Sequence, residues 1–224
     1  PALVARGEAV LTAHLPGHGR GGTDRFTVEA TRRRLDALLA VAAGLGPPVV
    51  LLGQSMGGAF ALDAVVRGAP VTGLATVSAP LALPAVMPVW RELGAALARE
   101  NWPAARQAPP GELLPAVGPY KRDRFPIRIP AGASYIEAFR RALLALDLPR
   151  RLAAAPPAAP ALLLHGSADG VIPAAHGARL ARAYGDRAEL VLLPGCHHLD
   201  VLIRPRVIDR LTRWFDEQKQ QAGV

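Results

Sequence analysis

The sequence holds little of several residue types, and each shortage argues against a class of protein. Cys196 is the one cysteine among 224 residues, which excludes an internal disulfide framework and favours a reducing compartment. The Cys-x-x-Cys and His-Glu-x-x-His spacings that bind zinc are absent, so we expect no metal and no cofactor. No apolar run approaches the ~20 residues of a membrane span, so we expect a globular protein without an integral membrane segment.

Acidic residues are outnumbered by basic ones. The net charge is +8, and the densest basic stretches lie at residues 32–34 and 121–124. Such charge suits nucleic acid, but no nucleic-acid-binding motif accompanies it, so we interpret it as a solvated surface. A mild attraction for anionic substrates is compatible with it. The Arg-, Ala- and Pro-rich composition and the single cysteine favour a cytoplasmic, bacterial protein, and the oligomeric state stays open.

The most informative segment runs from Gly53 to Gly58, directly after an apolar run at residues 49–52. The run predicts a buried strand and residues 57–67 predict a helix, so Ser55 falls at a sharp strand-to-helix turn. Gly53 and Gly57 lack a Cβ, which lets the arms of the turn pass closely while the Ser55 hydroxyl projects. A purely structural turn has the same five-residue pattern, but the flanking strand and helix favour a nucleophile.

Strand and helix signals alternate over residues 1–80 and 159–224, which predicts an α/β core with parallel strands. We expect strands at residues 8–13, 49–52, 71–77, 162–164 and 189–193, and helices at 27–45, 57–67, 174–184 and 201–218. Residues 81–158 interrupt the pattern and hold twelve of the 22 prolines, with helices expected at 89–99 and 134–146. We interpret this insertion as a lid over the carboxyl edge of the sheet; a solvent-side embellishment is the alternative.

A serine hydroxyl becomes a nucleophile when a base takes its proton, and neutral imidazole is the usual base. His197 and His198 follow the predicted strand at 189–193, in a loop on the same side of the sheet as Ser55. Asp169 lies in the loop after the strand at 162–164 and can orient the imidazole. The chain order of serine, aspartate and histidine is the one expected for this turn in an α/β sheet. Cys196 lacks such a turn, so we interpret it as a packed thiol.

These motifs together resemble the α/β-hydrolase family. Four segments carry the resemblance. Residues 15–21 resemble the family's loop after its fourth strand, and residues 53–58 resemble its nucleophile elbow. Residues 165–173 resemble its acid loop, and residues 195–205 resemble its histidine loop. The resemblance implies a mostly parallel sheet with helices on both faces and a helical lid. Its Gly-x-x-His spacing selects His198 as the base, with His197 as the runner-up. It also implies that the Met56 backbone N–H binds the oxyanion.

Among subgroups, the Leu-Pro-Gly-His-Gly loop and the internal lid are most similar to monoacylglycerol-lipase and lysophospholipase-like serine hydrolases. This implies a small-molecule acyl substrate, an ester cleaved through an acyl-enzyme on Ser55. The same triad serves amide, thioester or carbon–carbon bond hydrolysis and acyl transfer, and a non-catalytic ligand-binding protein is the alternative of another class. Candidate substrate-binding residues are Gln54, Trp90, Trp102 and Tyr135.

Two departures from the family pattern stand out. His14 occupies a position where the family usually has aspartate, which is mainly a structural site. The family also begins with three strands and a His-Gly loop that would lie upstream of Pro1, so we interpret the chain as a fragment lacking its amino-terminal part. In the sheet, we therefore expect the strand between those at residues 8–13 and 49–52 to be missing. We also expect one oxyanion donor to be absent, a loss that costs ~10²–10³ in turnover.

Overall fold

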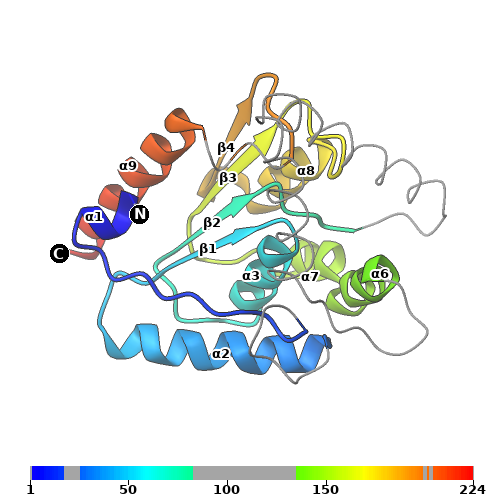
Figure 1. The fold of residues 1–224 in the computed structure, drawn as a ribbon, viewed down its shortest axis with the longest axis horizontal. Helices are drawn as coiled ribbons and strands as arrows, with labels where there is room; N and C mark the ends of the chain where they lie inside the picture. The colour runs from blue at the N-terminus through cyan, green and yellow to red at the C-terminus, as the bar shows by residue number, and fades with distance from the viewer. Residues whose placement is uncertain (1, 18–25, 83–134, 199–200, 202–203, 224) are drawn as a thin grey trace, which may run out of the picture.

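Four parallel strands form the sheet of this computed structural model, in the order β1-β2-β3-β4 (Figure 1). They are β1 (Val50–Gln54), β2 (Gly73–Val77), β3 (Ala161–Gly166) and β4 (Ala188–Leu193). The structure describes residues 2–17, 26–82, 135–198, 201 and 204–223. Because all four strands run the same way, their carboxyl ends meet at one edge of the sheet, where Ser55 follows β1.

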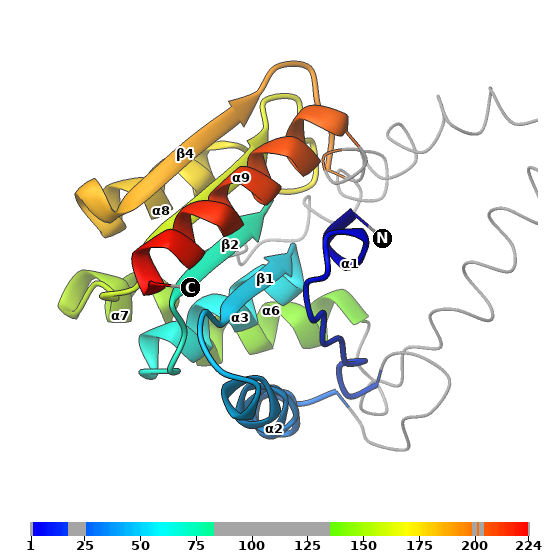
Figure 2. The same cartoon turned by 90° about the vertical axis from the view of Figure 1, so that its left-hand side faces the viewer.

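Helices cover both faces of this sheet (Figures 1 and 2). In chain order they are α1 (Ala2–Ala5), α2 (Val28–Gly44), α3 (Met56–Val66), α6 (Tyr135–Leu146), α7 (Leu148–Ala154), α8 (Ala175–Tyr184), the short 3₁₀ helix η1 (Gly185–Arg187) and α9 (Pro205–Ala222). On one face α3 packs on β1 and β2 while α8 packs on β3 and β4, with α2, α6 and α7 outside α3. On the other face α9 packs against β3.

The core divides in two because neighbouring residues of a strand point to opposite faces of the sheet. Leu74 and Leu163 belong to the larger cluster beneath α3 and α8. Val77 and Leu164 belong to the smaller cluster beneath α9, which also holds Trp214. The central strands β2 and β3 are buried on both faces, as the continuous apolar runs predict.

The predicted strand at residues 8–13 is wrong. Residues 8–15 form no ladder with another strand, and Val10 and Leu11 are 46% and 38% exposed. Instead, Arg6 and Glu8 hold this segment to α9 through ion pairs with Asp216 and Lys219, both at 2.7 Å. In the described part of the chain β1 therefore ends the sheet.

The other elements lie close to their predicted ranges, except that α1, α7 and η1 were not predicted and the closing helix begins at Pro205 rather than at residue 201. Thr27 caps α2 by accepting a hydrogen bond from the Ala30 N–H at 3.1 Å. The expected helix at residues 89–99 lies outside the described residues. Among the residues that are described, no helix is long and apolar enough to cross a bilayer.

Candidate active site

Ser55 lies between the last residue of β1 and the first residue of α3, in a strained backbone conformation. Its φ is 51° and its ψ is −122°, a region that costs a non-glycine residue of order 1–3 kcal/mol. Its N–H donates to the Val77 carbonyl at 2.8 Å, so the strained residue stays tied to the neighbouring strand. The turn thereby presents the hydroxyl at the carboxyl edge of the sheet, next to the amino end of α3.

The glycines of this turn have different roles from those expected. A Cβ on Gly53 would lie 2.5 Å from the Gly57 carbonyl oxygen, and one on Gly58 would lie 2.7 Å from the Ala79 Cβ. A Cβ on Gly57 would meet nothing within 4 Å. The close approach of the two arms therefore depends on Gly53 and Gly58, and the structural role predicted for Gly57 is wrong.

Three side chains from separate loops form one hydrogen-bonded chain at this edge. The His198 Nε2 lies 3.0 Å from the Ser55 Oγ, and the His198 Nδ1 lies 2.9 Å from the Asp169 Oδ2. An ionised carboxylate only accepts, so Nδ1 carries the imidazole hydrogen and Nε2 accepts from the Ser55 hydroxyl. His198 and Asp169 are 4% and 7% exposed, which keeps water away from the bond that orients the ring.

Asp169 is held as a carboxylate by its surroundings. Its Oδ1 accepts hydrogen bonds from the Val171 and Ile172 N–H groups at 2.9 and 2.8 Å. Burial alone would raise the pKa of Asp169, but His198 and the Ile172 N–H outweigh it and hold that pKa below its ordinary value. Asp169 is therefore negatively charged at neutral pH and can stabilise a positive imidazolium.

Ser78 and His165 also adjoin Asp169, and neither was assigned a role from the sequence. Ser78 is fully buried at the end of β2 with φ at 50°, and its hydroxyl helps to lower the pKa of Asp169. Among the described residues that hydroxyl makes no hydrogen bond of ordinary geometry. The signal for Ser78 is its positive φ, which depends on tertiary structure and cannot be recognised in the sequence.

The remaining predicted site residues fall into three groups. Gln54 lies beside the hydrogen-bonded chain, where its Nε2 donates to the His198 carbonyl oxygen at 3.4 Å. Met56 is the first residue of α3, directly after Ser55, whereas His197 is exposed and is not the residue bonded to Ser55. Tyr135 begins α6, and Trp90 and Trp102 lie outside the described residues.

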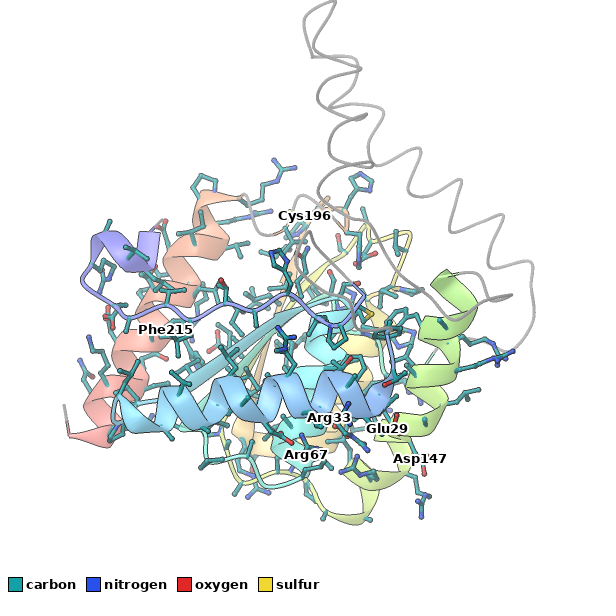
Figure 3. All side chains as sticks on the ribbon, turned by 60° about the horizontal axis from the view of Figure 1, so that its bottom comes forward. Glu29, Arg33, Arg67, Asp147, Cys196 and Phe215 are labelled. Carbon is teal, nitrogen blue, oxygen red and sulfur yellow. The ribbon has the colours of Figure 1, made fainter. Side chains whose placement is uncertain are left out.

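Cys196 is buried one residue before the histidine pair, and Figure 3 labels it on the loop beyond the strands. Its Sγ lies 3.4 Å from an Arg206 nitrogen. A Cβ on Gly166 would lie 2.3 Å from the Cys196 carbonyl oxygen, so the histidine loop packs tightly on the end of β3. Within the described ranges no cluster of three or more His, Cys, Asp or Glu side chains is arranged to hold a metal.

Comparisons with known proteins by family profile, by sequence and by structure all find alpha/beta hydrolases. The profile of the alpha/beta hydrolase family matches residues 1–211. A monoacylglycerol lipase of Mycolicibacterium smegmatis is 30% identical over 94% of this chain and 79% of its own length. The crystal structure of a monoacylglycerol lipase of Paleococcus ferrophilus superposes with a TM-score of 0.60 at 21% identity, covering 90% of this chain and 79% of the other.

A carboxylesterase structure from the thaumarchaeon Nitrososphaera gargenis also superposes with a TM-score of 0.60, at 16% identity and over 93% of this chain and 79% of the other. At these identities the structural likeness establishes the fold alone. The profile match and the 30% identical relative add common descent, because both extend over most of the chain.

Proposed function

Because this chain belongs to the alpha/beta hydrolase family, we propose that it cleaves carboxylic esters with Ser55 as nucleophile, His198 as base and Asp169 as the residue that orients the base. The observation that carries the proposal is the hydrogen-bonded chain from Ser55 Oγ through the His198 ring to Asp169, with both bonds at 2.9–3.0 Å. A serine with an ordinary structural role has no need of a positive φ, an oriented imidazole and a charged carboxylate together.

In the first half of the reaction, the Ser55 oxygen forms a bond to the acyl carbon as its proton passes to His198 Nε2. The carbonyl π electrons move to the oxygen, where the Met56 N–H stabilises the charge. The carbonyl then re-forms, the bond to the leaving alcohol breaks, and the alcohol oxygen takes the proton from His198. The product of this half is an acyl ester of Ser55 and a free alcohol.

In the second half, water attacks the acyl carbon while His198 Nε2 takes one of its protons. Collapse of the intermediate releases the carboxylic acid, and His198 returns the proton to the Ser55 oxygen. Asp169 stays ionised throughout and stabilises the imidazolium that forms in both halves.

We further propose an acylglycerol or lysophospholipid as the natural ester, with residues 81–158 as a lid over Ser55. The 30% identical monoacylglycerol lipase supports the substrate class. The lid is supported by its point of departure, since Leu81 follows β2, the neighbour of the strand that precedes Ser55. There the Leu81 N–H donates to the His176 Nδ1 of α8 at 3.2 Å, which anchors the base of the insertion to the core.

Ester hydrolysis by the full protein tests the proposal, with p-nitrophenyl butyrate and a monoacylglycerol as substrates. Ser55→Ala should lower kcat by about 10⁴-fold or more, as loss of a triad nucleophile does. The matched control is Cys196→Ala, which should keep the activity if the nucleophile is the hydroxyl and not the neighbouring thiol. Wild-type turnover by Ser55→Ala would refute the mechanism, whereas cleavage of the p-nitrophenyl ester alone would refute only the acylglycerol assignment.

A further inference from the structure

His165 lies at the end of β3, inside the molecule and outside the chain of three groups described above. Its side chain is 2% exposed, and its Nε2 lies 2.8 Å from the Ile172 carbonyl oxygen. Because a carbonyl only accepts, Nε2 carries the ring hydrogen and donates it. Burial lowers the pKa of His165, so the ring is neutral at neutral pH and acts as a fixed donor.

The residue that His165 binds is the one that closes the turn around Asp169. While the Ile172 carbonyl accepts from His165, the Ile172 N–H donates to the Asp169 Oδ1 at 2.8 Å. Both polar backbone groups of Ile172 are thus used, one on each side of the turn. The His165 Nε2 also lies 3.5 Å from the Asp169 Oδ2, the oxygen that accepts from His198.

The His165 ring is itself held from behind by α8. A Cβ on Gly177 would lie 3.0 Å from the His165 Nδ1 and 3.3 Å from its Cβ and Cγ. The helix therefore packs closely against the ring, and a side chain at residue 177 would be in tight contact with it. Because the ring is confined between α8 and the turn at residues 169–172, its donor stays directed at the Ile172 carbonyl.

We propose that His165 is a positioning residue for the reaction, which acts on His198 through Ile172 and Asp169. This inference rests on the proposed function. A donor at His165 fixes the far end of the turn, the turn fixes the rotation of the Asp169 carboxylate, and the carboxylate fixes the tautomer and direction of the His198 ring. Loss of the donor leaves a buried carbonyl unpaired and releases the turn, so the carboxylate loses its alignment with His198 Nδ1.

Two substitutions at His165 separate this role from simple packing. His165→Leu removes the donor and should lower kcat by about 10²-fold with little change in KM, the size of effect that a 1 Å misplacement produces. His165→Gln keeps an amide N–H at a similar reach and should restore most of the loss. Leu163→Val, a core change two residues earlier in β3, is the control for lost stability and should keep kcat.

The deciding measurement repeats His165→Leu in an Asp169→Asn background, with the rate of labelling by a fluorophosphonate as the readout. A residue that acts through Asp169 has no further effect once that carboxylate is gone, so the second substitution should change the rate by less than about 2-fold. An equal loss in both backgrounds, an unchanged kcat in His165→Leu, or no rescue by glutamine would overturn the proposal.

Should His165→Leu fail to fold, His165→Asn takes its place, since its amide is too short to reach the Ile172 carbonyl. If the proposed ester hydrolysis by Ser55 is itself wrong, the variants give a different result. In that case Ser55→Ala itself stays active, and no variant at His165 bears on catalysis.

Discussion

Asp169 faces His198 with one carboxylate oxygen and two backbone N–H groups with the other. This division keeps the charge in place because rotation of the carboxylate would break three hydrogen bonds at once. The pKa of Asp169 lies below its ordinary value, so the group is ionised at neutral pH. At the scale of single residues, the negative charge of Asp169 is therefore what sets the tautomer of His198.

We expect Asp169→Asn to lower kcat by about 10⁴-fold, since an amide can donate to His198 Nδ1 and then favours the wrong tautomer. KM should change little, because the carboxylate does not touch the substrate. Steady-state kinetics on a p-nitrophenyl ester measure both constants, and circular dichroism checks the fold. A variant that retains kcat within about 10-fold would show that the carboxylate does not orient the base.

The sequence predicts the three residues of this chain but not their surroundings. Ser55 and Asp169 stand in loops directly after apolar runs, which places them at one edge of a parallel sheet. The choice between His197 and His198 needed the family spacing, and their catalytic roles stay a prediction. Ser78 could not be assigned, because its proximity to Asp169 arises from a strand that is distant in sequence. His165 lies four residues before Asp169, but the direction of its ring depends on packing against α8.

At the scale of elements, the turn between β1 and α3 depends on one close approach of backbone to backbone. Gly53→Ala should destabilise the fold by about 1–3 kcal/mol or more, because its Cβ would meet the Gly57 carbonyl oxygen at 2.5 Å. Gly57→Ala is the matched control and should be neutral or slightly stabilising, since the space there is open and alanine favours a helix. Thermal unfolding of the two variants measures the difference, and equal melting temperatures would contradict this account of the turn.

A second link between elements is the buried Asp63 carboxylate, which joins α2, α3 and α7. Its side chain is 1% exposed and receives hydrogen bonds from Arg32 and Arg151 at 2.6–2.8 Å and from Arg67 at 3.1 Å. Figure 3 shows Arg67 well away from Cys196, so this cluster is separate from the candidate site. Burial alone would raise the pKa of Asp63, but the arginines outweigh it and lower that pKa.

We expect Asp63→Asn to cost about 2–4 kcal/mol at neutral pH, since it leaves three arginines around a neutral group. Because the pKa of Asp63 in the folded chain lies below 3.8, its charge contributes stability that is fully present above about pH 4 and lost as the pH falls through the folded-state pKa. The gap in melting temperature between wild type and variant should therefore shrink below pH 4. The exposed partner of Arg67 supplies the control, Asp36→Asn, and a constant gap across the pH range would contradict the prediction.

The sequence predicts which segments form helices and strands better than it predicts which strands pair in the sheet. Buried strands and amphipathic helices carry their periodicity in the sequence, so β1 to β4, α2, α3 and α8 lie near their expected ranges. The short run at residues 8–13 has strand-like residues but no neighbouring strand to pair with, and pairing is what makes a strand. The missed helix α7 begins next to Pro149, and proline is also a signal for the end of a helix.

At the scale of the whole molecule, the sheet brings together residues that lie more than a hundred positions apart in the chain. Parallel strands separated by helices place every strand's carboxyl end on one side, and β1, β3 and β4 each deliver one group there. The α/β fold class follows from the alternating strand and helix signals in the sequence. The distances between Ser55, His198 and Asp169 follow from packing alone. The role of residues 81–158 as a lid stays a prediction, because residues 83–134 lie outside the described residues.

The most direct test of the central claim, that Ser55 is activated by His198, is the reaction of the full protein with a fluorophosphonate, followed by intact mass and peptide mapping. We expect a single adduct on Ser55, none in Ser55→Ala, and labelling slowed by about 10²-fold or more in His198→Ala. An adduct on another residue, or labelling of Ser55 at an unchanged rate without His198, would contradict it.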